Sequence, residues 1–520
     1  MKLGNLKKVR VAVSLTFLVL TGWSFLDIYF ATPPSWMNII LFLQFTPSLM
    51  KFLTLLSLSA TGFVVALLAT VMFGRVYCST ICPLGTLQDL VTFAARKLVR
   101  EKYHRPQKPF HVLRHGLLAL TVLTALGGSL AIVNLLDPLS SFGRILSNVA
   151  RPVLASAHNV LAFALESVNL YTLYPVPVKA LALASIAVPG LTLAILVWMS
   201  FRHGRLYCNT ICPLGAFLGL LSNFSVYRIT VNKDHCIGCN LCEQACKSGC
   251  IDKKLKVLDF TRCVGCYNCL AVCPSNGLEF QNILARKTSS GMEKTDFKRR
   301  EMLYNSGMLI TAAFGTTQTG MKKIISSKDS TVAVVKTMPL AAPGGRSIEH
   351  FTARCTACHL CVSACPSQVL SPSFLEYGLA GIMQPRMDYN AGFCNYECVA
   401  CSQVCPSGAL LPIAQEEKKL TQIGAAKFVK DNCIAYTEEK DCGACSEHCP
   451  TKAVRMVPYK KTVAPEVKEE YCIGCGACEH ACPTMPFKAI YVDGKAVHSF
   501  AKKPEVKKLD EKQLKEEFPF

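Results

Sequence analysis

Apolar residues in the N-terminal part of the chain form long stretches in which Leu, Val, Ala and Phe occupy every side of a helix. A helix needs roughly 20 apolar residues to cross a bilayer of about 30 Å. The stretches therefore predict four membrane-spanning helices, and a buried core helix would account for one of them but not for all. They run over Val11–Phe30, Phe52–Phe73, Leu113–Leu136 and Val178–Ser200.

Basic residues are unevenly distributed between these stretches. They are frequent before the first stretch, between the second and third, and after Ser200, whereas the loop between the first and second has only Lys51. The positive-inside rule then places those basic segments, and the chain that follows Ser200, in the cytoplasm. The outer loop contains the apolar segment Val153–Val168, for which an interfacial position and a re-entrant one both remain open.

One motif occurs twice, once after the second apolar stretch and once after the fourth. It reads R-V-Y-C-S-T-I-C-P-L-G from Arg75 to Gly85 and R-L-Y-C-N-T-I-C-P-L-G from Arg205 to Gly215. A single C-x3-C-P has too few thiols for an iron–sulfur cluster, but two copies supply four. We predict a redox or catalytic role, and leave open metal binding, cluster binding and dithiol–disulfide cycling. The four residues are Cys78, Cys82, Cys208 and Cys212.

Charge and cysteine content narrow the function classes. The net charge of +21 coincides with basic residues that flank apolar stretches, and no nucleic-acid-binding motif is present, so no nucleic-acid partner is expected. The 29 cysteines stand in tight, repeated spacings within 520 residues. Disulfide scaffolds are usually short, so metal ligation is the better interpretation.

The spacing C-x2-C-x2-C supplies three ligands to one 4Fe–4S cluster, and a fourth cysteine three residues on, usually followed by proline, serves the other cluster of a pair. Two such quartets follow the apolar stretches and predict a two-cluster ferredoxin module, with Lys247 in place of one proline. We expect one cluster on Cys236, Cys239, Cys242 and Cys273, and the other on Cys263, Cys266, Cys269 and Cys246.

Four more quartets lie in the C-terminal part, two of them with a longer first gap. They are Cys355, Cys358, Cys361, Cys365; Cys394, Cys398, Cys401, Cys405; Cys433, Cys442, Cys445, Cys449; and Cys472, Cys475, Cys478, Cys482. Structural zinc favours two separated C-x2-C pairs or Cys/His mixtures, so the six quartets predict six 4Fe–4S clusters. Cys250 is left as an ordinary thiol.

The expected fold class is an α-helical membrane domain with four to five transmembrane helices, joined to α+β bacterial-type ferredoxin domains. The expected divisions are a membrane domain at 1–222, a two-cluster ferredoxin domain at 223–285, a linker at 286–345, a four-cluster ferredoxin domain at 346–498 and a charged tail at 499–520.

The apolar stretches, the two Y-C-x-T-I-C-P-L-G motifs and the first ferredoxin module resemble the NapH/MauN type of membrane ferredoxin. Residues from about 298 to 500 resemble the NapG/MauM type of four-cluster ferredoxin. The resemblance implies a fused quinol dehydrogenase component that passes electrons from membrane quinol, with menaquinol the expected donor, to a terminal reductase or other redox protein. A quinone site is implied too. Its candidates at the outer membrane edge are Asp137, Arg144 and Arg151, for which interface anchoring is an equal alternative.

The junction between the two parts carries Lys298-Arg299-Arg300-Glu301-Met302-Leu303 ahead of the weakly apolar Met308–Phe314. It resembles a twin-arginine signal, which would add a fifth span and place the last four clusters in the periplasm; a basic linker beside a buried helix is the alternative. The expected location is the bacterial inner membrane, multi-pass, with the first ferredoxin domain cytoplasmic.

In the resembling four-cluster ferredoxins the first motif pairs with the last and the two middle motifs pair with each other. Carried over, Cys482 would join Cys355, Cys358 and Cys361 on one cluster. Cys365 would join Cys472, Cys475 and Cys478. The middle quartets would exchange Cys405 and Cys449. The spacing alone also allows four self-contained clusters. A second function also remains open, in which the C-x3-C-P thiols reduce a metal or thiol on another protein during its maturation or regulation.

Overall fold

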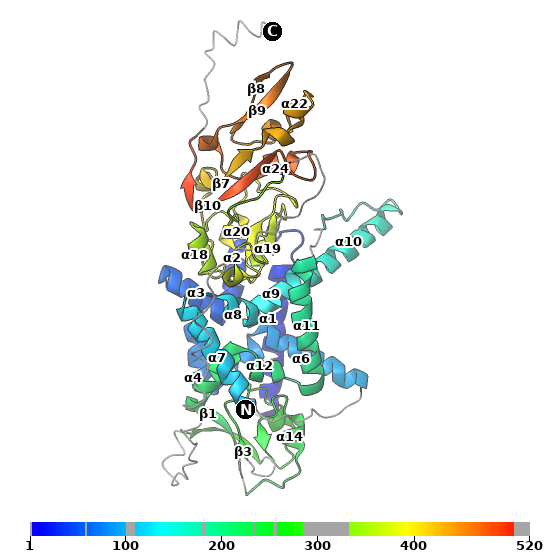
Figure 1. Cartoon of the computed structure of the whole chain (residues 1–520). Helices are drawn as coiled ribbons and strands as arrows, with labels where there is room; N and C mark the ends of the chain where they lie inside the picture. Colours follow the sequence, from blue (N-terminus) through cyan, green and yellow to red (C-terminus); the bar gives the residue numbers. More distant parts are fainter. Residues whose placement is uncertain are drawn as a thin grey trace.

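The computed structural model describes residues 3–57, 60–99, 110–178, 183–232, 234–252, 257–275, 277–283 and 332–503 (Figure 1). A helical region, residues 3–226, lies between two other regions. The first cysteine-rich region, residues 227–283, lies at one end of it, and the second cysteine-rich region, residues 332–503, lies at the other (Figure 1). The expected twin-arginine segment Lys298–Leu303 and the apolar Met308–Phe314 lie outside the described residues.

The helical region begins with its longest helix, which runs from the end that carries the first cysteine-rich region toward the other end (Figure 1). Its α-helices are α1 (Leu3–Leu26), α2 (Pro34–Leu41), α3 (Phe45–Leu55), α4 (Gly62–Phe73), α5 (Tyr77–Thr80), α6 (Pro83–Val99), α7 (His111–Leu126), α8 (Ala131–Leu136), α9 (Pro138–Ile145), α10 (Arg151–Glu166), α11 (Leu183–His203), α12 (Leu206–Thr210) and α13 (Pro213–Leu221). A π-helical turn, Leu146–Ala150, joins α9 to α10, and a 3-10 turn, Ser222–Phe224, follows α13.

Two described helices are long and apolar enough to cross a bilayer, over Asn5–Leu26 in α1 and Ser185–His203 in α11. Helices α2 and α3 pass the same test only as a pair bent by 108°. The second expected span is not continuous, because α3 ends at Leu55, Leu56 turns left-handed with φ 47°, and α4 begins at Gly62. The third is divided between α7 and α8. The described residues thus hold two or three candidate spans.

The helical region exposes many apolar side chains and buries several arginines. Val19 on α1 and Leu68 on α4 are 65% and 61% exposed, while Arg75 and Arg205 are fully buried at 0%. Soluble proteins bury apolar side chains and keep arginine at the surface. The reverse arrangement is the one expected where lipid surrounds the helices. Helix α10 projects away from the others (Figure 1), and its residues Val153 and Val160 are exposed, which agrees with the interfacial alternative.

The first cysteine-rich region consists of β1 (Tyr227–Val231), α14 (Leu241–Ala245), β2 (Ile251–Asp252), β3 (Val257–Leu258), α15 (Asn268–Val272) and β4 (Leu278–Asn282). Strand β1 pairs antiparallel with β4, and β2 with β3. Its contact with the helical region combines aromatic packing, such as that of Phe73 on Tyr227, with hydrogen bonds. Ser79 Oγ lies 3.4 Å from the Gly265 carbonyl oxygen, and Arg114 Nη2 donates to the Thr261 carbonyl over 2.9 Å.

The second cysteine-rich region contains three antiparallel strand pairs, β5–β6, β7–β10 and β8–β9. Its strands are β5 (Leu370–Pro372), β6 (Pro385–Met387), β7 (Thr421–Phe428), β8 (Val454–Tyr459), β9 (Thr462–Val467) and β10 (Ile490–Phe500). Its α-helices are α18 (Ile348–Thr352), α19 (Leu360–Ser363), α20 (Ala400–Gln403), α21 (Gln415–Lys418), α22 (Ile434–Thr437), α23 (Ala444–Glu447) and α24 (Ala477–Ala481); single 3-10 turns lie at Leu379–Gly381, Lys430–Asn432 and Glu469–Tyr471.

This second region is docked on the helical region by hydrogen bonds. Asn148 Nδ2 lies 2.8 Å from His359 Nδ1, and the hydroxyls of Ser147 and Ser363 are 2.7 Å apart. A Cβ added to Gly143 of α9 would lie 2.2 Å from the Cys358 carbonyl oxygen, so the α19 loop rests directly on α9.

Candidate functional site

The structure brings the four C-x3-C-P cysteines together from the two repeats. Cys78 and Cys82 flank the end of α5, Cys208 and Cys212 flank the end of α12, and all four are free and buried. The Cys212 thiol interacts electrostatically with those of Cys208, Cys82 and Cys78. We call these four residues the four-thiol site. Within the described residues no group of three or more His, Cys, Asp or Glu side chains is arranged for a single metal ion, and the donor set that recurs in this chain is four thiols.

Each repeat is fastened to the other by its arginine. Arg205 Nη1 donates to the Cys78 carbonyl over 2.6 Å, and Arg75 Nη2 donates to the Cys208 carbonyl over 3.0 Å. Arg75 Nη2 also lies 4.0 Å from Cys78 Sγ. Gly85 allows this approach, because a Cβ there would lie 2.3 Å from the Cys78 carbonyl oxygen and 2.6 Å from Arg205 Nη1. Gly215 makes the same close approach in the other repeat, where a Cβ would lie 2.3 Å from the Cys208 carbonyl oxygen and 2.8 Å from Arg75 Nη2.

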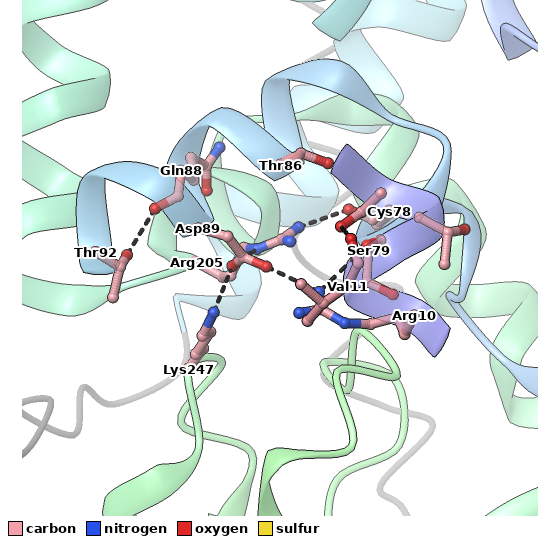
Figure 2. Close-up of polar contacts among 12 residues, drawn as sticks. Arg10, Val11, Cys78, Ser79, Thr86, Gln88, Asp89, Thr92, Arg205 and Lys247 are labelled. Carbon is pink, nitrogen blue, oxygen red and sulfur yellow. Dashed lines mark hydrogen bonds and ion pairs between the residues drawn. The ribbon is translucent and has the colours of Figure 1, made fainter. Parts of the chain in front are cut away.

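A carboxylate of α6 stands beside the site and binds three cations. Figure 2 shows Asp89 between Arg205, Arg10 and Lys247, with Nε of Arg205 at 2.9 Å, Nη1 of Arg10 at 2.8 Å and Nζ of Lys247 at 3.0 Å. In the same view Gln88 lies one residue away, and its Oε1 is 3.6 Å from Cys208 Sγ. Sequence reasoning missed this network. Its signal was Lys247, which stands where a cluster motif usually has proline.

The two repeats differ at the position of that carboxylate. Asp89 lies eleven residues after Cys78, and the residue eleven after Cys208 is Gly219. A Cβ at Gly219 would lie 1.8 Å from Arg114 Nη2, so a guanidinium occupies the space. Arg205 therefore has a carboxylate partner, whereas Arg75 binds only neutral groups among the described residues, namely the Asn209 side chain, the Cys208 and Thr261 carbonyls and the Cys78 sulfur.

In the first cysteine-rich region one small cavity is lined by the cysteines expected on a single cluster. They are Cys246, Cys263, Cys266 and Cys269. Cys250 lines the same cavity, with its sulfur 3.4 Å from that of Cys246. The hydrogen bond from Cys250 lowers the pKa of the Cys246 thiol to about 6, against the effect of burial. Cys250 is thus a close neighbour of a predicted ligand rather than an unrelated thiol.

The other expected set in this region is also gathered. Burial raises the pKa of the Cys242 thiol, and the neighbouring thiols of Cys239 and Cys273 raise it further. Cys239 is exposed, whereas Cys263, Cys266 and Cys269 are buried. Their loop faces the helical region, since Gly265 contacts Ser79. The buried set is therefore the inner one, and the set that includes Cys239 is the outer one.

The quartets of the second cysteine-rich region pair in sequence order, and the nested pairing carried over from the resemblance is wrong. Burial raises the pKa of the Cys361 thiol, and Cys358, Cys355 and Cys405 raise it further. Burial also raises the pKa of the Cys401 thiol, and the thiols of Cys394 and Cys365 raise it further. The first two motifs therefore exchange their fourth cysteines.

The last two motifs do the same. A small cavity is lined by Cys433, Cys442, Cys445 and Cys482, which were not expected together. Burial raises the pKa of the Cys478 thiol, and Cys475, Cys472 and Cys449 raise it further. Cysteine spacing alone fits both the sequential and the nested pairing. In either one, each cluster takes three cysteines from one loop and a fourth from another.

The residues predicted for a quinone site lie where the helical region meets the second cysteine-rich region. Asp137 accepts hydrogen bonds from the backbone N–H and the hydroxyl of Ser140, each over 2.8 Å. Arg144 donates to the Leu135 carbonyl over 2.9 Å, and Arg151 donates to the carbonyls of Asp27 and Ser363. Their hydrogen-bond partners in the structure are protein groups, and their role toward a quinone stays a prediction.

Comparisons with protein families match all the cysteine motifs, although the last match begins after Cys433. A 4Fe-4S binding domain matches residues 56–101 and 186–231, which contain the two C-x3-C-P motifs. A second 4Fe-4S binding domain matches 229–252 and 256–279. A 4Fe-4S dicluster domain matches 354–409 and 440–485. Each dicluster match spans two successive motifs, in agreement with the sequential pairing.

Several named proteins are similar to parts of the chain. The putative electron transport protein YccM of Escherichia coli is 24% identical over 39% of this chain and 50% of its own length. The methylamine utilization ferredoxin-type protein MauM of Methylophilus methylotrophus is 29% identical over 32% of this chain and 70% of its own. The ferredoxin-type protein NapH of Haemophilus influenzae is 25% identical over 42% and 66%. No solved structure matches.

The donor sets and these similarities agree. Four-thiol sets line the cavities of both cysteine-rich regions, which is the ligand chemistry of a 4Fe–4S cluster, and the domain families that match are named for that cofactor. The chain therefore contains 4Fe-4S binding domains, and its parts are similar to the ferredoxin-type and electron transport proteins NapH, MauM and YccM.

Proposed function

We propose that this protein crosses the bacterial inner membrane and passes electrons from quinol, with menaquinol as the donor, through its 4Fe–4S clusters to a partner reductase. One observation carries the proposal. The two cysteine-rich regions lie at opposite ends of a helical region that exposes many apolar side chains (Figure 1). A soluble electron carrier has no need of an apolar layer between its cluster domains.

The proposed topology has four to five spans, with the first cysteine-rich region in the cytoplasm and the second in the periplasm. Arg10, Arg114 and Lys247 all contact the end of the helical region that carries the first cysteine-rich region. Basic residues collect on the cytoplasmic side of membrane proteins, which supports this orientation. The opposite end then faces the periplasm, together with the predicted quinone residues.

The sequential pairing gives the cysteine sets of the second region a spatial order. The set with Cys358 rests on α9, and the Cys394 backbone N–H donates to the Cys475 carbonyl over 2.9 Å, so the second and fourth motifs are adjacent. The set with Cys433 lies beside α22, near the far end of the molecule (Figure 1). We infer that the partner reductase docks there. When bound, the clusters supply one-electron carriers, and the chain's role is to hold them in this order.

The alternative is a reductase that acts on a metal or thiol of another protein through the C-x3-C-P cysteines. Such a reaction needs a sulfur that a second protein can reach. The four thiols are each 4–5% exposed and are enclosed by α6, α13 and the first cysteine-rich region. This burial favours electron transfer within the chain.

The test is oxidation of a menaquinol analogue by the purified protein in liposomes under anaerobic conditions, followed by the visible absorbance of the clusters. We expect menaquinol to bleach the visible absorbance of the clusters. Arg151→Gln should slow this reaction. The control Arg455→Gln, at an exposed position of β8, should leave its rate unchanged. Clusters that dithionite reduces but menaquinol does not would contradict a quinol donor.

A further inference from the structure

We propose that the two C-x3-C-P repeats, each of which matches a 4Fe-4S binding domain, share one further 4Fe–4S cluster on the four-thiol site, inside the helical region and beyond the six predicted from the quartets. Its role as a relay between the two cysteine-rich regions rests on the proposed function, whereas its binding rests on the donors and charges around it. All four sulfurs belong to free, buried cysteines, and each repeat supplies two. Four thiolates are the complete ligand set of such a cluster.

The local fold prepares two of these sulfurs as ligands. Cys82 and Cys212 immediately precede Pro83 and Pro213, the first residues of α6 and α13. The Gly215 backbone N–H points at Cys212 Sγ over 3.3 Å. Unpaired N–H groups at a helix N-terminus favour negative charge, and amide hydrogen bonds to cysteine sulfur are typical of cluster sites.

The buried positive charge beside the four-thiol site favours binding of an anion. Arg75 is completely buried, lies 4.0 Å from Cys78 Sγ, and has no carboxylate partner among the residues that the structure describes. Asp89 is already shared by Arg205, Arg10 and Lys247. A buried guanidinium without a counter-charge is strongly unfavourable. A cluster ligated by four thiolates is a net anion in both of its usual oxidation states and would compensate this charge.

Three buried donors beside the thiols have no hydrogen-bond partner. They are Nε of Arg75, Nη2 of Arg205 and Nε2 of Gln88. Buried polar groups in folded proteins are almost always paired, so several orphaned donors around one set of thiols indicate a missing acceptor. Cluster sulfides and thiolates are such acceptors.

A dithiol–disulfide pair explains these features less well. Both of its states are electrically neutral, so Arg75 would lack a counter-charge throughout the cycle. Oxidation of the dithiol would also release two protons into the site. Asp89, the carboxylate beside it, is held in three ion pairs and is therefore a poor proton acceptor. A cluster carries one electron at a time without a proton, as the neighbouring clusters do.

The site also lies between the predicted clusters at the two ends. On one side, Ser79 follows Cys78 and contacts Gly265, which lies between Cys263 and Cys266. On the other side, Tyr207 precedes Cys208, and Arg144 interacts electrostatically with both Tyr207 and Cys358. A bilayer core of about 30 Å is too thick for one electron-transfer step between its two faces. A cluster at the four-thiol site would divide that distance.

The decisive experiment counts iron and acid-labile sulfide in the anaerobically purified full chain. We expect the double variant Cys78→Ser/Cys208→Ser to lose about four irons and about four sulfides per chain and to keep the signals of all other clusters in electron paramagnetic resonance (EPR) spectra. Cys250→Ser is the matched control, since it also removes a buried thiol but should keep the full iron content. Unchanged iron in the double variant would overturn the proposal.

A second variant covers the case in which the double variant does not fold. Arg75→Gln keeps all four thiols, so iron content should be retained while one reduction potential falls and the others stay unchanged, because a positive charge beside one cluster is lost. If no potential moves, no cluster lies beside Arg75 and the proposal fails. These readouts do not involve quinol, so a failed quinol assay would refute the proposed function and leave this result intact.

Discussion

Nη1 of Arg205 donates a hydrogen bond to the carbonyl of Cys78, which lies 127 positions earlier in the chain. The reciprocal bond joins Arg75 to Cys208, so each copy of the C-x3-C-P motif is held in place by the arginine of the other copy. The duplication is therefore not two independent sites. It forms one site with pseudo-two-fold character, and its symmetry is broken where Asp89 in one repeat corresponds to Gly219 in the other.

Replacing Asp89 should be strongly destabilising. Asp89→Asn would leave the buried charges of Arg10, Arg205 and Lys247 without their carboxylate. Breaking a buried ion network from one side costs about 3–5 kcal/mol. Thermal unfolding in detergent, with cluster absorbance as the signal, should show a large drop in the midpoint temperature.

The control for this variant is Glu438→Gln, which breaks the exposed pair with Lys440. Exposed ion pairs contribute little, so its midpoint should match that of the unaltered protein. Equal midpoints for Asp89→Asn and the unaltered protein would mean that the network does not hold the repeats together.

A methyl group at Gly85 should separate the two repeats. In Gly85→Ala the new Cβ would lie 2.3 Å from the Cys78 carbonyl oxygen and 2.6 Å from Arg205 Nη1, so backbone and guanidinium must both move. Overpacking of this kind costs about 1–3 kcal/mol or more. Gly116→Ala in α7 is the matched control, because nothing lies within 4 Å of its Cβ, and it should stabilise the helix slightly. Similar unfolding temperatures for the two variants would contradict the tight approach.

Several features could be predicted from residue spacing, because spacing alone decides them. Three cysteines at intervals of three can wrap one cluster, and the family comparisons agree that these segments bind 4Fe–4S clusters. The repeat around Cys78 and Cys208 likewise indicated two thiol pairs in one site. Hydropathy identified the apolar segments but not their continuity, since the break at Leu56 depends on one backbone conformation.

Other features depend on contacts between distant segments, which spacing does not encode. Asp89 meets Lys247 only because the first cysteine-rich region folds back onto α6. The nested pairing was taken from a resemblance, whereas the cavity that places Cys482 beside Cys433 depends on the packing of α24 against α23. No pattern within a single motif distinguishes the two pairings.

Cys250 should tune the inner cluster of the first cysteine-rich region. Its thiol lies 3.4 Å from the sulfur of Cys246, a predicted ligand, and hydrogen bonds to ligand sulfurs raise a cluster's reduction potential. Cys250→Ala should therefore lower the potential of one cluster and leave the iron content unchanged, as measured by EPR-monitored redox titration. Cys246→Ser is the contrasting variant, in which that cluster's signal should be lost or altered. A potential that does not move in Cys250→Ala would show that the thiol makes no such bond.

The sequential pairing in the second cysteine-rich region can be tested by additivity. Two ligands of one cluster act as a unit, so removing both should cost no more iron than removing either, whereas ligands of different clusters should give summed losses. Sequential pairing places Cys355 with Cys405 and Cys482 with Cys433. Cys355→Ser/Cys405→Ser should then lose about four irons per chain, and Cys355→Ser/Cys482→Ser about eight. The nested pattern predicts the reverse, because it assigns Cys355 and Cys482 to one cluster. Iron analysis of the two double variants and the three single variants separates the patterns, and EPR signals of the remaining clusters verify that the rest of the chain is folded.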